Sequence, residues 1–270
     1  MSSPLIYANG CSYSNSSYYP DLNGKVHADY VGETLNGFVL NKSICGSNNR
    51  RIIRTSLHDI IHQRQLNPKQ KIIALISLSF EIRSDLWVDD LIINQVDDIT
   101  PDYPEESQFV THQFSALTDW RERLLLGKPI YTPWPKRIQS EMLRSKFSTH
   151  LSRAKAFFFS SYAERINLLT DLLMFTAVCK QYNINYLIFQ APIAQQLNDE
   201  YLLDFFKDQI AKDLRIFNLE TFGFLNWAHE QKFIPLDMLD NPTIGHYNSD
   251  AHKAFADQVL IPKLKETKQI

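Results

Sequence analysis

The sequence carries little excess charge of either sign. Its 270 residues include 28 lysines and arginines against 30 aspartates and glutamates, which gives a formal net charge of −2. Such a balance offers no electrostatic reason to expect binding to nucleic acid or to an acidic membrane surface. We therefore expect neither nucleic acid nor a membrane as a partner.

Cysteine is also scarce. The three cysteines, Cys11, Cys45 and Cys179, are too few for a disulfide framework and have no metal-ligand spacing, which suits a reducing compartment. His58 and His62 lie one helical turn apart, but no third ligand accompanies them. We expect no metal and no cofactor.

Long apolar runs, repeats and low-complexity tracts are missing as well. No apolar stretch approaches the length of a membrane span. The first four residues, Met1-Ser2-Ser3-Pro4, show neither the basic region nor the hydrophobic core of a signal peptide. These absences lead us to expect a cytoplasmic protein.

What the sequence does contain is an alternation of strand-like and helix-like segments. Apolar residues make up 44% of the chain, enough for a sizeable core. Strands are expected at 4–7, 38–41, 71–79, 185–191 and near 215–219, and helices at 29–36, 48–64, 152–182, 198–212, 223–231 and 248–265. Strands that alternate with helices predict an α/β fold with a parallel sheet and right-handed crossovers.

One stretch interrupts this alternation. Between 85 and 149 the sequence is acidic and rich in proline, and it contains Trp87, Trp120 and Trp134 without clear periodicity. We predict a single domain over 1–270, in which 85–149 is an inserted helical and loop region or lid. A helical subdomain that only covers the sheet is an equal alternative. Its aromatic residues suit either a sugar-stacking platform or a core.

Small and polar residues recur where strands are expected to end. Ser12 follows the first strand within Gly10-Cys11-Ser12, and Gly46-Ser47-Asn48 follows the second. Ser77 to Arg83 end the third, and Gly245-His246 precede the last helix. Since the carboxyl ends of parallel strands share one edge of a sheet, we expect these loops to meet there.

These residues suit acyl transfer, which needs a nucleophile, a base and donors for the developing oxyanion. Ser12 is the candidate nucleophile and its amide a candidate oxyanion donor; the alternative is a turn serine that caps a helix. His246 is the candidate base, with His252 as its rival, although His252 is better suited to packing or capping. A thiol-dependent site at Cys11 and Cys45 is a weaker alternative.

The same segments resemble a known family. Tyr7-Ala-Asn-Gly-Cys-Ser-Tyr-Ser14 looks like the first block of the SGNH (GDSL-like) hydrolases, in a branch that reads Gly-Cys-Ser. Asn41 to Asn48 and Gly245 to Ala254 are similar to its second and last blocks. The resemblance implies a flavodoxin-like three-layer α/β/α sandwich and ester or acyl-transfer chemistry. It also implies Ser12 as nucleophile, Gly46 as oxyanion donor and His246 as base.

The chain departs from that family pattern at two positions. Ser79 stands where the third block offers an asparagine, and Asn48 is a candidate replacement, though capping of the following helix suits it equally. Thr243 stands where the acid is usual, so Asp240, Asp237 or a backbone carbonyl would have to orient His246. Losing the orienting acid can weaken a triad severely.

The sequence thus predicts an SGNH-like esterase or acyltransferase that acts on a small ester or an acylated glycan. Ser79, Arg83 and Tyr13 are the candidate substrate contacts, although Arg83 could instead pair with Glu81. The competing prediction is a non-catalytic relative that binds a glycan or a protein in the same pocket. Ser79 and Thr243, which stand where the family has its asparagine and its acid, favour this second prediction.

Overall fold

The computed structural model describes residues 3–16, 24–44, 47–79, 84–87, 109–114, 131–133, 161–192, 201–236 and 245–270. The chain divides into two compact units, one formed by Met1–Phe80 with Arg165–Ile270 and the other by Glu81–Glu164. No helix among the described residues is long and apolar enough to cross a membrane.

The first unit is built on four parallel strands in the order β2-β1-β3-β7. Their bounds are β1 Leu5–Asn9, β2 Phe38–Asn41, β3 Ile72–Leu78 and β7 Asn185–Gln190. Every residue of β1 and β3 is buried, which explains why these strands appear as continuous apolar runs. This strand order is the flavodoxin-like one, and its switch point between β1 and β3 is where ligands bind in such sheets.

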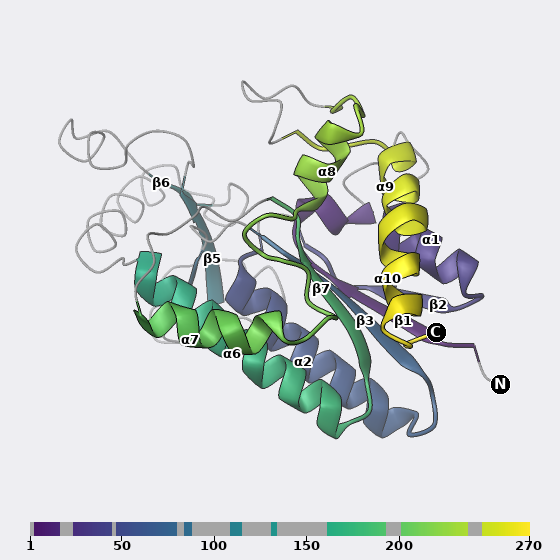
Figure 1. Ribbon diagram of the computed structural model, residues 1–270, viewed down its shortest axis with the longest axis horizontal. Helices are drawn as coiled ribbons and strands as arrows, with labels where there is room; N and C mark the ends of the chain where they lie inside the picture. Colours follow the sequence, from purple (N-terminus) through teal and green to yellow (C-terminus); the bar gives the residue numbers. More distant parts are fainter. Residues whose placement is uncertain are drawn as a thin grey trace, which may run out of the picture. The chain divides into compact units, whose positions relative to one another are not determined.

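Helices cover both faces of this sheet (Figure 1). The helices of the described residues are α1 His27–Thr34, α2 Asn49–Leu66, α6 Ser161–Gln181, α7 Tyr201–Ala211, α8 Phe224–Glu230, α9 Ser249–Phe255 and α10 Ile261–Glu266. The main core lies between the sheet and α1, α8, α9 and α10. α2 and α6 pack on the other face, where Tyr7 reaches Asp59 and Phe175 meets Tyr186 edge-on. The predicted three-layer α/β/α sandwich is confirmed.

The second unit has a small sheet of its own. Its three antiparallel strands, in the order β4-β5-β6, are β4 Ser84–Trp87, β5 Phe109–Phe114 and β6 Tyr131–Pro133. The sequence did not suggest strands in this region. The roles of lid and of sugar-stacking platform stay predictions, because much of 85–149 lies outside the described residues.

Two expected elements differ from those observed. The strand expected near 215–219 is a single bridge between Ile188 and Ile216, because the side chain of Asp213 holds Arg215 in a turn. The closing helix begins at its expected cap, Asn248, but it contains a π-helical turn, η5 Ala256–Leu260. Pro262 follows that turn and has no N–H to offer to an α-helical bond.

The face of α6 that points into the core is narrow. Leu169 and Leu172 are buried, but Leu173 and Val178 are only half-buried. Phe175 is among the side chains that fill the core there. The stretch 152–160, expected to open this helix, lies outside the described residues.

The far edge of β7 is closed by side chains rather than by a full strand. Gln269 pairs with the backbone of Tyr186, accepting from its N–H at 2.6 Å and donating to its carbonyl at 3.0 Å.

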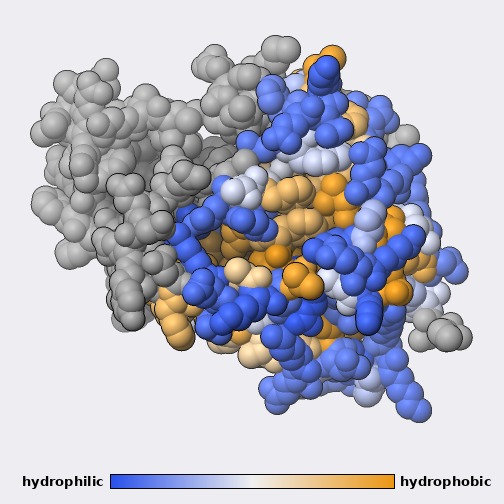
Figure 2. Space-filling view, in the orientation of Figure 1, coloured by the Kyte–Doolittle hydropathy of each residue, from blue (hydrophilic) through white to orange (hydrophobic). Residues whose placement is uncertain are grey.

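Burial raises the pKa of Asp213, but hydrogen bonds from Arg215 and Tyr186 outweigh burial and bring it to about 2. Apolar side chains gather beside this edge, between α7 and α10 (Figure 2).

Two histidines lie side by side in the main core. Their Nδ1 atoms are 3.2 Å apart, and both His27 and His252 are buried. One imidazole has to donate and the other to accept, so the two rings cannot both be protonated. Burial lowers the pKa of His27 to about 3. It also lowers that of His252 well below the usual value, and the nearby imidazoles of His27 and His246, when protonated, would lower it further.

We expect the protein to lose stability as the pH falls below about 6.5, the ordinary histidine pKa. Between that pH and about 3 the unfolded chain holds a proton on His27 that the folded protein excludes. The free energy of unfolding should then fall by about 1.4 kcal/mol per pH unit for this histidine alone. Urea unfolding between pH 7.5 and 4.5 measures this slope.

A double variant, His27→Leu with His252→Leu, should have a shallower slope than the wild type. The matched control is His229→Leu, the same change at an exposed histidine, which should keep the wild-type slope. Equal slopes in the double variant and the wild type would show that the buried pair does not cause the acid sensitivity.

Candidate active site at the carboxyl edge of the sheet

The turn after β1 is held on both sides by buried asparagine and serine side chains. Asn9 accepts from the amide of Gly10 at 2.9 Å, and its Nδ2 contacts Ile52 O, Thr55 and Ser56 of α2. A Cβ at Gly10 would lie 3.0 Å from Ser14 and from Ser77, so only glycine fits without displacing them. The chain then enters a short 3-10 helix, η1 Ser12–Ser14.

The second loop is tied directly to this turn. The amide of Ile44 donates to the carbonyl of Gly10 at 3.1 Å, and Asn41 Nδ2 donates to the carbonyl of Ser14 at 2.8 Å. Asn48 then caps α2, because its Oδ1 accepts from the amide of Arg51 at 2.8 Å. The capping role proposed for Asn48 is therefore observed, and its role as oxyanion donor stays a prediction.

The third loop is fixed by a two-way hydrogen bond from α2. Asn49 Oδ1 accepts from the amide of Ser79 at 2.6 Å, and Asn49 Nδ2 donates to the carbonyl of Ser79 at 3.1 Å. The buried side chain of Asn49 thus pairs with Ser79 as a neighbouring strand would. Asn49, which follows the loop after β2, therefore also holds the loop after β3 in place.

The last loop meets the first through two stacked rings. The centroids of Tyr13 and His246 are 4.6 Å apart, with 28° between the ring planes. Tyr13 follows Ser12 directly, so this contact brings the candidate base to the turn that carries the candidate nucleophile. Ser12 and His246 are both buried, each with 7% of its surface exposed.

The structure changes the expectation for other residues. Tyr13, a candidate substrate contact, is 3% exposed, and its ring packs on His246. His252, the rival base, stacks on Phe224 in the core, as the packing alternative required. Gly46, Asp240 and Arg83 lie outside the described residues, as do Asp237, Thr243, Glu81 and Cys45. Their roles stay predictions.

Two parts of this arrangement were missed from the sequence. Arg51 is buried although it is charged, and its Nη1 donates to Ser47 Oγ at 3.1 Å. Asn49 looked like an ordinary first helical residue after a cap. Its neighbour in the fold, Ser79, is distant in sequence, so no local pattern marks the pair.

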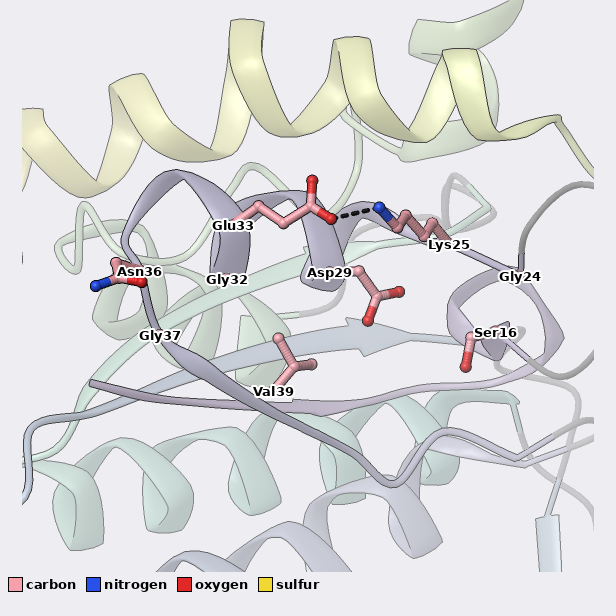
Figure 3. Close-up of a pocket in the computed structure, with 9 residues that line it drawn as sticks. All are labelled: Ser16, Gly24, Lys25, Asp29, Gly32, Glu33, Asn36, Gly37 and Val39. Carbon is pink, nitrogen blue, oxygen red and sulfur yellow. Dashed lines mark hydrogen bonds and ion pairs between the residues drawn. The ribbon is translucent and has the colours of Figure 1, made fainter. Parts of the chain in front are cut away.

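A separate groove lies between α1 and β2 (Figure 3), with a volume of about 500 Å³. Its polar groups already have partners: Lys25 pairs with Glu33, and Asp29 accepts from the amide of Val26 at 2.8 Å. Burial raises the pKa of Asp29 above its usual value. The charged side chains that line this groove are thus paired with each other or with the backbone.

Among the described residues, no group of histidine, cysteine or acidic side chains is arranged to hold a metal ion. What the carboxyl edge does assemble is a serine hydroxyl on a tight glycine turn, an imidazole against the same turn and the capped start of α2. A hydroxyl with an imidazole close by is the arrangement that nucleophilic acyl chemistry uses.

No protein-family model matches the chain, and no curated protein matches it. Among solved structures it is similar to the psychrotrophic esterase EstA from Pseudoalteromonas sp., in a crystal structure described as inhibited by monoethylphosphonate. The identity is 12%, the alignment covers 98% of this chain and 99% of that chain, and the TM-score is 0.43. At this TM-score the likeness carries no functional information, so the function has to be inferred from the site.

Replacing Asn49 by alanine should destabilise the protein by about 1–3 kcal/mol, because the change removes both side-chain partners of Ser79 at a buried loop. The free energy of unfolding in urea measures the loss. Asn67→Ala is the matched control, since Asn67 is the exposed cap at the other end of the same helix. It should cost no more than about 0.5 kcal/mol, and equal losses in the two variants would contradict the anchoring role.

Proposed function

We propose that the protein is an SGNH-like serine hydrolase or O-acyltransferase that acts on a small ester or an acylated glycan through an acyl-enzyme on Ser12. The observation that carries this proposal is the stacking of His246 on Tyr13, the residue next to Ser12. A nucleophile and its base must lie close together in the fold, and the stacking brings together Ser12 and His246 from opposite ends of the chain.

In the proposed reaction, Ser12 Oγ attacks the ester carbonyl while the imidazole of His246 accepts its proton. The tetrahedral intermediate collapses, the bond between carbonyl carbon and alcohol oxygen breaks, and His246 returns the proton to that oxygen. Water or an acceptor alcohol then attacks the acyl-enzyme in the same way. Which of the two attacks decides between hydrolysis and transfer.

The oxyanion needs donors that point to one place. The amide of Ser12 is at the first position of η1, where a helical N–H has no partner within its own helix. We propose this amide as one donor and the amide of Gly46 as a second. Asn48, the residue that caps the start of α2, is a third candidate donor.

The base also has to be held in a fixed orientation. The ring of Tyr13 packs on one side of His246, and the amide of Leu236 donates to the carbonyl of His246 at 2.7 Å. These two contacts support a fixed position of the base. We propose Asp240 as its orienting acid.

A non-catalytic protein that binds a glycan or a partner at this edge is the second candidate. The observation that favours it is the third loop, where Ser79 replaces the usual asparagine and has its backbone paired with Asn49. Such a protein would keep the pocket and lack a reactive serine. Covalent labelling separates the two candidates.

A fluorophosphonate probe should label the wild type, and Ser12→Ala should abolish both labelling and ester hydrolysis, the latter by at least about 10³-fold. Ser14→Ala is the matched control from the same turn, because the buried Ser14 Oγ makes no hydrogen bond. It should keep labelling. An unlabelled wild type would instead favour the non-catalytic candidate.

Tyr13→Leu should lower kcat about 10- to 100-fold and change KM much less, because a base displaced by about 1 Å still permits substrate binding but not efficient proton transfer. Tyr13→Phe keeps the ring and should restore most of kcat. Steady-state kinetics on one small ester measures both. If Tyr13→Phe were as impaired as Tyr13→Leu, the hydroxyl and not the stacked ring would be the important group.

A further inference from the structure

The chain segment before position 237 runs beside His246. The amide of Leu236 donates to the carbonyl of His246 at 2.7 Å, and Pro235 forms an antiparallel bridge with Tyr247. The two segments therefore make a short ribbon in which Leu236 lies directly opposite His246. By the same register, Ile234 lies opposite Asn248.

The two faces of this ribbon have different surroundings. Opposite residues of an antiparallel pair share a face, and successive residues alternate between faces. Tyr247 is buried and meets the ring of Phe224 edge-on at 6.0 Å, so the face that it shares with Pro235 turns to the core. Leu236 and His246 share the other face, on which the ring of His246 meets Tyr13.

This second face carries uncovered apolar surface. Leu236 is 48% exposed, and Ile234, two residues earlier on the same face, is 73% exposed. Two large apolar side chains beside a candidate base are positioned to contact part of a substrate. The part that they contact follows from the direction of proton transfer.

In ester cleavage the base returns its proton to the leaving oxygen. The alcohol oxygen must therefore be within hydrogen-bond reach of His246 when its bond to the carbonyl carbon breaks. The oxyanion donors hold the carbonyl oxygen, and the acyl chain leaves the reacting carbon by a bond other than the one to the alcohol oxygen. The group nearest to Leu236 is consequently the carbon skeleton of the alcohol.

We propose that Leu236 and Ile234 form a subsite for the alcohol portion of the ester, and that the substrate is an ester of an apolar alcohol. This inference rests on the proposed function and narrows it. Apolar side chains beside the leaving oxygen favour an alkyl or aryl alcohol over the hydroxyl-rich ring of a sugar. Only the apolar group gains binding free energy when its surface leaves water.

The test compares ethyl, butyl and hexyl acetate, which differ only in the alcohol, with the wild type and with Leu236→Ser/Ile234→Ser. In the wild type kcat/KM should rise about two- to fourfold for each added CH2 group, as expected when a methylene leaves water. The double variant should lower the ratio of hexyl to ethyl acetate at least about 10-fold. Ethyl acetate, butyrate and hexanoate, which differ only in the acyl group, should keep their wild-type ratios.

The matched control is Leu214→Ser, which removes a leucine that is 62% exposed beside Arg215, away from the carboxyl edge. It should keep the wild-type dependence on the alcohol. All three positions are at the surface, and a thermal melt checks that each variant is folded. The wild-type series alone already tests the subsite should the double variant fail to fold.

A wild type with equal kcat/KM for all three acetates would overturn the subsite and leave the proposed function standing. A double variant that keeps the wild-type ratio of hexyl to ethyl acetate would also overturn the subsite. So would a double variant that changes the ratios among the ethyl esters and not those among the acetates. A wild type that hydrolyses no ester and is not labelled at Ser12 would overturn the proposed function and this inference together.

Discussion

The arrangement at the carboxyl edge depends on how closely the chain packs around Gly10. A side chain there would lie 3.0 Å from Ser14 and from Ser77, and the carbonyl of Gly10 accepts the amide of Ile44. The serine turn, the loop after β2 and the end of β3 thus approach each other at a residue that has no side chain. They keep their spacing because this contact leaves none of them room to shift.

Several features could be predicted from the sequence because they depend on neighbours in the chain. β3 is a continuous apolar run, and α2 follows a capping asparagine with isoleucines at helical spacing. The switch point of the sheet then follows from the order of the elements alone, since a nucleophile candidate that ends β1 has to lie there. These are local patterns, and the structure confirms the elements that they predict.

The features that were missed depend on partners far away in the chain. Nothing near Asn49 indicates that its amide pairs with Ser79, and nothing near His27 indicates a hydrogen bond to His252. Tyr13 was predicted as a substrate contact, and that role stays a prediction. The packing of its ring on His246 is a contact that sequence spacing cannot reveal. Burial of Arg51 likewise depends on a serine in the preceding loop.

The pairing of Gln269 with Tyr186 has a consequence for the order in which the sheet is completed. Both backbone groups of Tyr186 that face away from β3 are satisfied by one side chain near the end of the sequence. During synthesis the ribosome releases β7 long before it releases Gln269. Until Gln269 has also emerged this rung of the sheet is hydrated, so the edge of β7 closes only after the chain far beyond β7 has been made.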